Sequence, residues 1–220
     1  MPFVLALDCC SRWTNVGCSD DGVVLGEIHL NVGRKQSALL PTVVDGLLRS
    51  LDRSLHDIDL IAVTTGPGYF TGLRVGISYA LSLAEGINVP VVPVSTMEAM
   101  IYDLVHPGAL FVPLLWARRD EVYGAIYAAP EKDADLVSIL PPTFLPFREL
   151  LDQARGQQLP CLWAGEDLSR FASDLEREWR FPNRAAARVG NVALLGERDR
   201  AAATNPDSLT LSYLRGADLG

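Results

Sequence analysis

The chain has 220 residues, of which 49% are hydrophobic and 21% are charged, a composition typical of a folded globular protein. Its formal net charge of −8 disfavours a stand-alone nucleic-acid binder, because affinity for phosphates rests mainly on Lys and Arg. The opening MPFVLALD lacks a basic flank, and no apolar run approaches the ~20 residues of a membrane span, so we expect a cytoplasmic protein that does not enter a membrane.

Three short β-rich runs open the chain, at residues 3–8, 14–18 and 23–30. A turn sequence at 20–22 joins the last two, so the pattern predicts three antiparallel strands in a row. Over residues 37–52 the spacing of apolar residues becomes helical and predicts an amphipathic helix.

A continuous apolar run at 60–64 predicts a buried strand, which leads through the glycine-rich loop 66–72 into a helix over 71–85. Gly66 and Gly68 supply flexible backbone next to the start of that helix. This arrangement suits the binding of an anion, and it equally suits a tight strand-to-helix turn without a ligand.

The rest of the chain continues the alternation in weaker form, with a proline-rich connection over 141–146. The further predicted elements are a strand at 90–94, a helix from 95 to 105, hairpin strands at 111–116 and 122–128, a helix at 147–155, a strand at 161–164, a helix at 168–179 and a short helix at 192–198. This order predicts an α/β fold with mixed antiparallel and parallel strands, as in the half-domain of actin and hexokinase.

Conventional catalytic motifs are missing from the sequence. The three histidines, His29, His56 and His106, are too far apart to form a helix-borne metal pair. There is no G-x-S-x-G nucleophile elbow and no G-x-x-x-x-G-K-[ST] phosphate loop. The four cysteines form no C-x-x-C pair, so we expect reduced thiols rather than a zinc site or disulfides.

Asp8 and Ser11, at the end of the first predicted strand, occupy the usual place for a nucleotide and magnesium in an actin-like lobe. An alternative is that Asp8 only caps the turn between two strands. Cys9 and Cys10 stand in turn positions where a phosphate loop favours glycine. An actin-fold ATPase or kinase that uses Asp8 therefore stays open as a second hypothesis.

The helix over 71–85 has a row of small residues, Gly72, Gly76 and Ala80, at a spacing of four. Such a row leaves a shallow groove along one side of a helix. It suits ordinary core packing, or, together with the leucine-rich helix over 37–52, a two-helix docking face for a partner.

The segment TGPGYFTGLRVG, residues 65–76, resembles the hallmark G-P-G-S-F-T-G-[LV]-R-[IV]-G of the TsaB (YeaZ) family. The chain departs from the family at Tyr69, which is usually Ser, at Gln36, where His is common, and at Trp116, where Asp is frequent. The resemblance extends to Leu5-Ala6-Leu7-Asp8, Ser37-Ala38-Leu39-Leu40-Pro41, Pro93-Val94-Ser95-Thr96, Ala117-Arg118 with Glu121-Val122-Tyr123, and Tyr213-Leu214-Arg215.

The resemblance implies an actin/hexokinase-like (ASKHA, ribonuclease H-like) fold of two lobes, which we place at 1–105 and 106–220, with the last helix able to pack back on the first lobe. It implies a non-catalytic scaffold that binds TsaD and, with it, TsaE, in the transfer of threonylcarbamoyl from threonylcarbamoyl-adenylate to the tRNA adenosine next to the anticodon. The tRNA is then met only through the complex, and the chain pairs as a homodimer when TsaD is absent. A glycoprotease-like hydrolase is a further alternative. It is the weaker one, because the resemblance implies an inactive peptidase homologue.

The resemblance also implies no catalytic residue, no metal and no tightly bound cofactor, with ATP or ADP held only at the interface of the complex. The expected partner or dimer contacts are Leu40, Val44, Leu47, Gly72, Val75, Gly76 and Tyr79. The expected nucleotide-proximal residues are Asp8, Ser11, Gly66 and Gly68.

Overall fold

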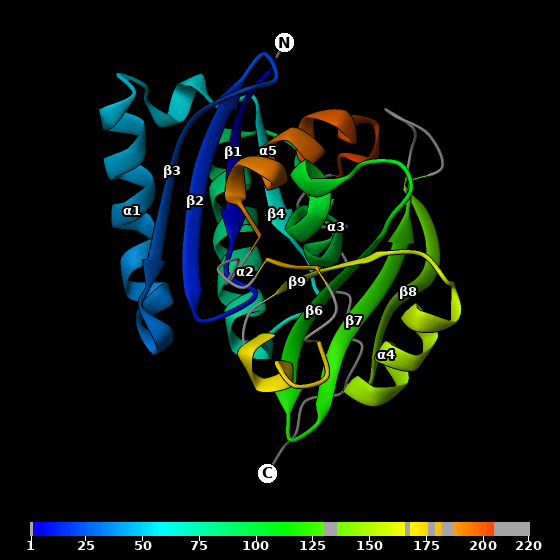
Figure 1. Cartoon of the computed structure of the whole chain (residues 1–220). Helices are drawn as coiled ribbons and strands as arrows, with labels where there is room; N and C mark the ends of the chain where they lie inside the picture. The colour runs from blue at the N-terminus through cyan, green and yellow to red at the C-terminus, as the bar shows by residue number, and fades with distance from the viewer. Residues whose placement is uncertain (1, 130–135, 166–167, 176–178, 182–186, 205–220) are drawn as a thin grey trace. The chain divides into compact units, whose positions relative to one another are not determined.

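The computed structural model describes residues 2–129, 136–165, 168–175, 179–181 and 187–204, which form two compact units (Figure 1). The first unit comprises residues 2–99 and 187–204, and the second comprises the described residues from 100 to 181. We expected a boundary at residue 105; the chain instead divides near residue 99, and the segment from 187 returns to the first unit.

The first unit contains a five-stranded sheet in the order β3-β2-β1-β4-β5. Its strands are β1 (Phe3–Asp8), β2 (Trp13–Asp20), β3 (Val23–Asn31), β4 (Leu60–Thr64) and β5 (Val91–Val94). The first three strands are antiparallel to one another, as predicted, whereas β1, β4 and β5 run parallel. Parallel neighbours need crossover connections, and helices supply them here.

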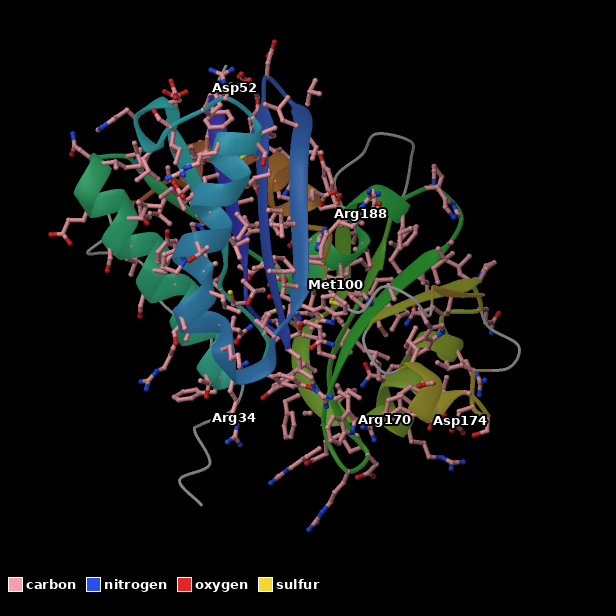
Figure 2. The ribbon with its side chains drawn as sticks, turned by 90° about the vertical axis from the view of Figure 1, so that its left-hand side faces the viewer. Arg34, Asp52, Met100, Arg170, Asp174 and Arg188 are labelled. Atoms are coloured by element: carbon pink, nitrogen blue, oxygen red, sulfur yellow. The ribbon has the colours of Figure 1, made fainter. Side chains whose placement is uncertain are left out.

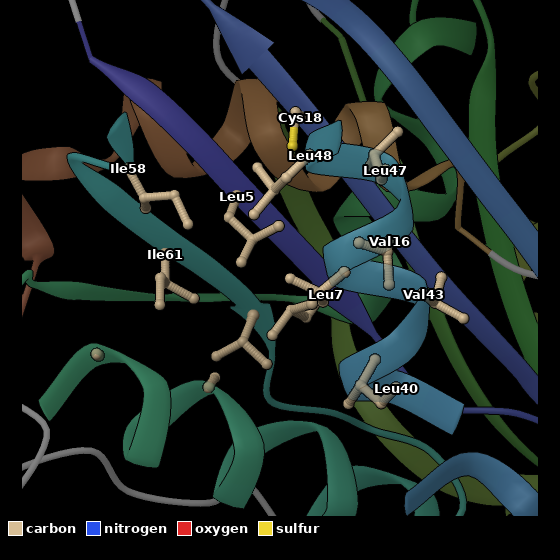
Figure 3. Close-up of a cluster of buried hydrophobic side chains, with 14 of the residues drawn as sticks. Leu5, Leu7, Val16, Cys18, Leu40, Val43, Leu47, Leu48, Ile58 and Ile61 are labelled. Carbon is tan, nitrogen blue, oxygen red and sulfur yellow. The ribbon is translucent and has the colours of Figure 1, made fainter. Parts of the chain in front are cut away.

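Two crossover helices, α1 (Gln36–Ser50) and α2 (Phe70–Ile87), lie side by side on one face of this sheet (Figure 2). The opposite face carries α5 (Val189–Arg198), which lies behind the strands in Figure 3. Side chains along β1 point alternately to the two faces of the sheet, and Leu5 and Leu7 lie in the core under α1 and α2. On the other side, Gly196 of α5 packs directly on Ala62 of β4.

Helix α2 is longer than the sequence predicted. It continues through Gly86 and ends at Ile87, and the next residue, Asn88, takes the left-handed conformation with φ 58°. Asn tolerates this conformation better than most residues, so it supplies the helix stop that we had expected from Gly86. The next helix, α3 (Thr96–Ile101), begins where Ser95 accepts a hydrogen bond from the backbone N–H of Glu98.

The second unit repeats the topology of the first, with a sheet in the order β10-β9-β6-β7-β8. Its strands are β6 (Leu110–Arg118), β7 (Glu121–Ala128), β8 (Val137–Pro146), β9 (Cys161–Gly165) and β10 (Trp179–Phe181). Here too the first three strands are antiparallel and the last two run parallel to the first. The duplicated order β-β-β-α-β with a further parallel strand confirms the predicted actin/hexokinase-like fold class.

Helix α4 (Phe147–Gly156) packs on β7 and β8 and closes the core of the second unit. Phe147, at the start of α4, stacks on Phe171 with ring centroids 3.9 Å apart and also contacts Trp163 of β9. The three rings bring the helix, the strand and the 3-10 turn η4 (Leu168–Phe171) into one hydrophobic cluster.

Two predictions for the second half are wrong. The proline-rich stretch is not a connection but most of strand β8, which contains Pro141, Pro142 and Pro146. Proline is tolerated there because β8 is an edge strand. The helix predicted at 168–179 is replaced by η4 and, after residues 176–178, which lie outside the described part, by the strand β10.

Short elements complete the described chain, and the edge of β5 pairs with the segment that follows α5. There, Val91 and Thr204 exchange two backbone hydrogen bonds of 3.1 and 2.9 Å.

Within the residues that the structure describes, no helix is long and apolar enough to cross a membrane. The short elements are η1 (Gly33–Lys35), η2 (Leu55–Asp57), η3 (Tyr102–Leu104) and η5 (Arg200–Ala202).

Candidate functional site

Asp8, the last residue of β1, has no exposed surface, and both of its carboxylate oxygens accept hydrogen bonds from the same unit. The backbone N–H of Cys10 (3.1 Å) and the hydroxyl of Thr64 (2.7 Å) donate to Oδ1. The side-chain amide of Asn15 donates to Oδ2 at 2.8 Å. Asp8 therefore ties β1 to the following turn, to β2 and to β4, and both of its oxygens have hydrogen-bond partners inside the fold.

The turn after Asp8, residues 9–12, is called the β1 turn here. Burial, with the negative charge of Asp8 as a second cause, raises the pKa of Cys9 to about 12 and the pKa of Cys10 well above its ordinary value. Both thiols are buried and stay protonated at neutral pH, so they act as small packing groups rather than nucleophiles.

The glycines that begin α2 make room for the β1 turn. A Cβ on Gly68 would lie 2.5 Å from the carbonyl oxygen of Cys10, and a Cβ on Gly72 would overlap the carbonyl oxygen of Cys9. A Cβ on Gly76 would come within 3.2 Å of the Cβ of Cys9. The groove that the row of small residues predicted is thus filled by the chain's own turn.

Hydrogen bonds from both helices clamp the β1 turn. The backbone N–H of Tyr69, just before α2, donates to the carbonyl of Cys10 at 2.7 Å. The buried side chain of Gln36, the first residue of α1, donates to the carbonyls of Ser11 and Trp13 at 3.1 and 2.8 Å. Gln36 therefore fastens this turn to the start of α1.

The predicted nucleotide-proximal residues come together only in part. Asp8, Ser11 and Gly68 surround the β1 turn, and the hydroxyl of Ser11 accepts a hydrogen bond of 3.2 Å from the backbone N–H of Trp13. Gly66 lies beyond the end of β4 with φ 115°, and its carbonyl accepts a hydrogen bond from Thr96. Each of these groups therefore has a role in joining neighbouring segments.

All seven predicted contact residues belong to the first unit, and five of them are buried. Leu40, Val44 and Leu47 point into its core and are at most 4% exposed, as Figure 3 shows for Leu40 and Leu47. Gly72 and Gly76 are buried against the β1 turn. This choice of residues is corrected, because the apolar stripe of each helix covers its own sheet and leaves these side chains no surface for a partner.

The outward side of the two helices is different in character. Val75 and Tyr79 of α2 are half-buried at its margin. Burial raises the pKa of Tyr79, and the charge of Asp45 on α1 raises it further, which places the phenol near that carboxylate. We define the two-helix surface as Pro41, Asp45, Val75, Ser78, Tyr79 and Ser82.

In the second unit, the hairpin between β6 and β7 occupies the position that corresponds to the β1 turn. Trp116 holds it through its indole N–H, which donates to the carbonyl of Arg119 at 3.0 Å. The guanidinium of Arg170 lies 4.1 Å from the Trp116 ring, and Arg118 forms an ion pair with Glu121 at 2.7 Å. Trp116 thus has a structural task that the family's more frequent Asp would not perform.

No group of three His, Cys, Asp or Glu side chains suited to a metal ion occurs within the described ranges. Of the three histidines, His29 contacts the side chain of Asn15 at 3.0 Å, and His106 packs edge-on against Phe111. His56 is exposed in the turn η2.

The two sheets with the same strand order define the class, an α/β protein of the actin-like type. The family model described as "TsaD: tRNA N6-adenosine threonylcarbamoyltransferase" matches residues 28–174 of the chain. A protein of known structure from Pseudomonas aeruginosa, described as similar to peptidase YEAZ, has a TM-score of 0.79 and 23% sequence identity, covering 98% of this chain and all of that one.

Two curated relatives carry the name "tRNA threonylcarbamoyladenosine biosynthesis protein TsaB". The relative from Bacillus subtilis is 27% identical over 98% of this chain and 95% of its own length. The relative from Escherichia coli is 36% identical over 58% of this chain and 56% of its own length. The chain belongs to the TsaD family and, within it, to the TsaB (YeaZ) group.

Proposed function

We propose that this chain is a non-catalytic partner subunit in the biosynthesis of threonylcarbamoyladenosine in tRNA. The observation that carries the proposal is the state of Asp8, whose carboxylate would hold magnesium or its bound water in an active actin-like lobe. Both of its oxygens accept hydrogen bonds within the unit, and the side chain has no exposed surface. This supports a structural role for Asp8 over an ATPase or kinase that depends on it.

The β1 turn supports the same conclusion. A phosphate that approached the start of α2 would have to displace the carbonyl of Cys10, which already accepts the backbone N–H of Tyr69. Displacing the turn would also uncover Gly72, whose backbone lies against the carbonyl of Cys9. The features that resemble an anion site are thus used to pack the first unit.

The chain acts on its target by docking to a TsaD-type threonylcarbamoyltransferase through the two-helix surface. This surface carries small or half-buried side chains, Val75, Ser78 and Ser82 among them, which allow another helix to approach closely. The same surface pairs two copies of this chain when the transferase is absent. TsaE joins through the transferase, and any ATP or ADP is held at the boundary between subunits.

Docking is tested with two exposed serines of α2. The double variant Ser78→Arg/Ser82→Arg adds two large cations to the two-helix surface without touching the core. We expect the affinity for the transferase, measured by sedimentation, to fall at least about tenfold, because the helices of the two proteins can no longer approach each other. Ser169→Arg, an exposed serine of η4, is the matched control and should leave the complex intact.

Activity is tested in the same preparations by reconstituting threonylcarbamoylation of tRNA with the transferase, with and without this chain. The chain alone should neither modify tRNA nor hydrolyse ATP, and its addition should restore modification. Turnover by the isolated chain, abolished by Asp8→Asn without loss of folding, would contradict the proposal.

A further inference from the structure

The first unit gathers positive charge at one end although the chain as a whole is acidic. Residues 9–19, 28–44 and 60–84 contain no Asp or Glu, in a chain that has 27 acidic and 19 basic side chains. The cations in these three segments are Arg12, Arg34, Lys35 and Arg74. Opposite charges are usually interspersed on a protein surface, so this separation needs an explanation.

The fold brings the three acid-free segments together. The backbone N–H of Gly33 donates to the carbonyl of Arg12 at 3.1 Å, which places the β1 turn beside η1 and its Arg34 and Lys35. Tyr69 donates to the same turn and brings the start of α2 to it. Figure 2 shows the Arg34 side chain extending from the ribbon at the end of the unit where α1 begins.

Arg74 contributes to this end although it lies in the second turn of α2. Its guanidinium lies 4.3 Å from the centre of the Phe70 ring, one turn nearer the start of the helix. Long side chains in helices point back toward the N-terminus, so the charge of Arg74 is carried toward the β1 turn. Both residues keep exposed surface.

Three of the cations near the β1 turn are not used for ion pairs among the described residues. In the part of the chain that the structure describes, Arg12, Arg34 and Lys35 are exposed and none of them is paired with a carboxylate. By contrast, Arg49 and Arg53 of the same unit form ion pairs of 3.1 and 2.9 Å. The unpaired cations are available to an external anion.

Aromatic rings lie among these cations. Trp13, Tyr69 and Phe70 flank the β1 turn and the start of α2, and all three are only partly buried. Partly exposed rings beside Arg and Lys are typical of surfaces that bind unpaired nucleotides, where rings stack on bases and cations neutralise the neighbouring phosphates. An acidic protein segment would use the cations but would leave the rings without a matching group.

We propose that this basic-aromatic end, composed of Arg12, Trp13, Arg34, Lys35, Tyr69, Phe70 and Arg74, binds unpaired nucleotides of the tRNA directly. The inference rests on the proposed function, which supplies tRNA as the nucleic acid. It goes beyond the expectation that tRNA is met only through the partner subunits. Because the whole chain is acidic, the contact is weak for the isolated chain and gains strength when the partner holds the same tRNA.

The charge contribution is tested by binding a fluorescently labelled tRNA transcript to the full chain assembled with its transferase, over a range of salt concentrations. Arg34→Gln/Lys35→Gln should lower the affinity about tenfold and reduce the slope of log affinity against log salt by about 1 to 2, since two phosphate contacts are lost. Arg49→Gln/Arg53→Gln removes the same charge elsewhere on the unit and should change the affinity less than about twofold. Equal effects of the two double variants would overturn the proposal.

The rings give a second, independent signature. Tyr69→Ser restores the residue that is usual in the resembled family and removes one stacking surface without changing the charge. We expect an affinity loss of about tenfold with an unchanged salt slope. An unchanged affinity would show that bases are not contacted and would contradict the proposal for the rings.

Sedimentation of the same samples separates this proposal from the proposed function. If Arg34→Gln/Lys35→Gln disrupts assembly with the transferase, the basic-aromatic end is a protein interface and the proposal is wrong. If no complex forms even with the natural chain, the proposed docking fails instead. The tRNA proposal is then tested by measuring the tRNA affinity of the chain alone at low salt. The variants must rank in the same order of affinity there.

Discussion

The two units share one strand order, yet the turn after their first strand is stabilised in opposite ways. In the first unit the buried carboxylate of Asp8 accepts three hydrogen bonds, and the β1 turn is enclosed by glycines of α2. In the second unit the corresponding hairpin is exposed and is held by Trp116, with the guanidinium of Arg170 over its ring.

This difference shows that a shared topology does not determine which interactions hold a given turn. A buried charge with complete hydrogen bonding is costly to disturb, because each donor that loses it is left unsatisfied away from water. An exposed cation over an aromatic ring contributes little to stability, because water solvates its charge when the contact is lost. Substitution at the turn should therefore lower the free energy of unfolding strongly in the first unit and weakly in the second.

The largest effect is expected for Asp8→Ala. The change leaves the amide of Asn15, the hydroxyl of Thr64 and the N–H of Cys10 without their acceptor, and we expect the free energy of unfolding of the first unit to fall by about 3 to 5 kcal/mol. Urea unfolding followed by hydrogen exchange, peptide by peptide, assigns the loss to one unit. Asp45→Ala, an exposed carboxylate on α1, is the control. A loss below about 1 kcal/mol would remove the contrast between the units.

A smaller but still large effect is expected for Gly72→Ala. Its Cβ would overlap the backbone carbonyl of Cys9, which cannot turn away as a flexible side chain would, so we expect a loss of about 2 to 4 kcal/mol. Gly86→Ala in the same helix meets no atom within 4 Å and should be neutral or stabilising by up to about 1 kcal/mol. Thermal unfolding of both variants tests this, and similar melting temperatures would show that the turn can move aside.

The fold was predictable where periodicity is strong and misread where one residue type dominates the local signal. The spacing in β1, β4 and α1 predicted each element nearly to its ends. The prolines of strand β8 predict a break in regular structure, whereas an edge strand accepts them. The apolar spacing predicts a helix where η4 lies, whereas the packing of Phe171 on Phe147, which is distant in sequence, decides the path of the segment.

Residues of the candidate site could be indicated from the sequence, but the contacts that they make could not. The sequence indicated Asp8 and the loop at Gly66 and Gly68, but the approach of the β1 turn to Gly72 depends on contacts far apart in the chain. An apolar stripe such as that of Leu40 also looks the same whether it covers its own sheet or a partner. The acid-free segments, by contrast, were visible in the sequence and acquire meaning only when the fold joins them.

The smallest effect is expected for Arg170→Gln in the second unit. The side chain is exposed, so loss of the contact between its guanidinium and the Trp116 ring should lower the free energy of unfolding by only about 0.5 to 1 kcal/mol. Arg148→Gln, an exposed arginine at the start of α4, should have almost no effect and serves as the control. Both values come from urea unfolding followed by tryptophan fluorescence. A loss for Arg170→Gln as large as that for Asp8→Ala would mean that the exposed hairpin is held as tightly as the buried turn, and that the two units differ in residues but not in the strength of their turns.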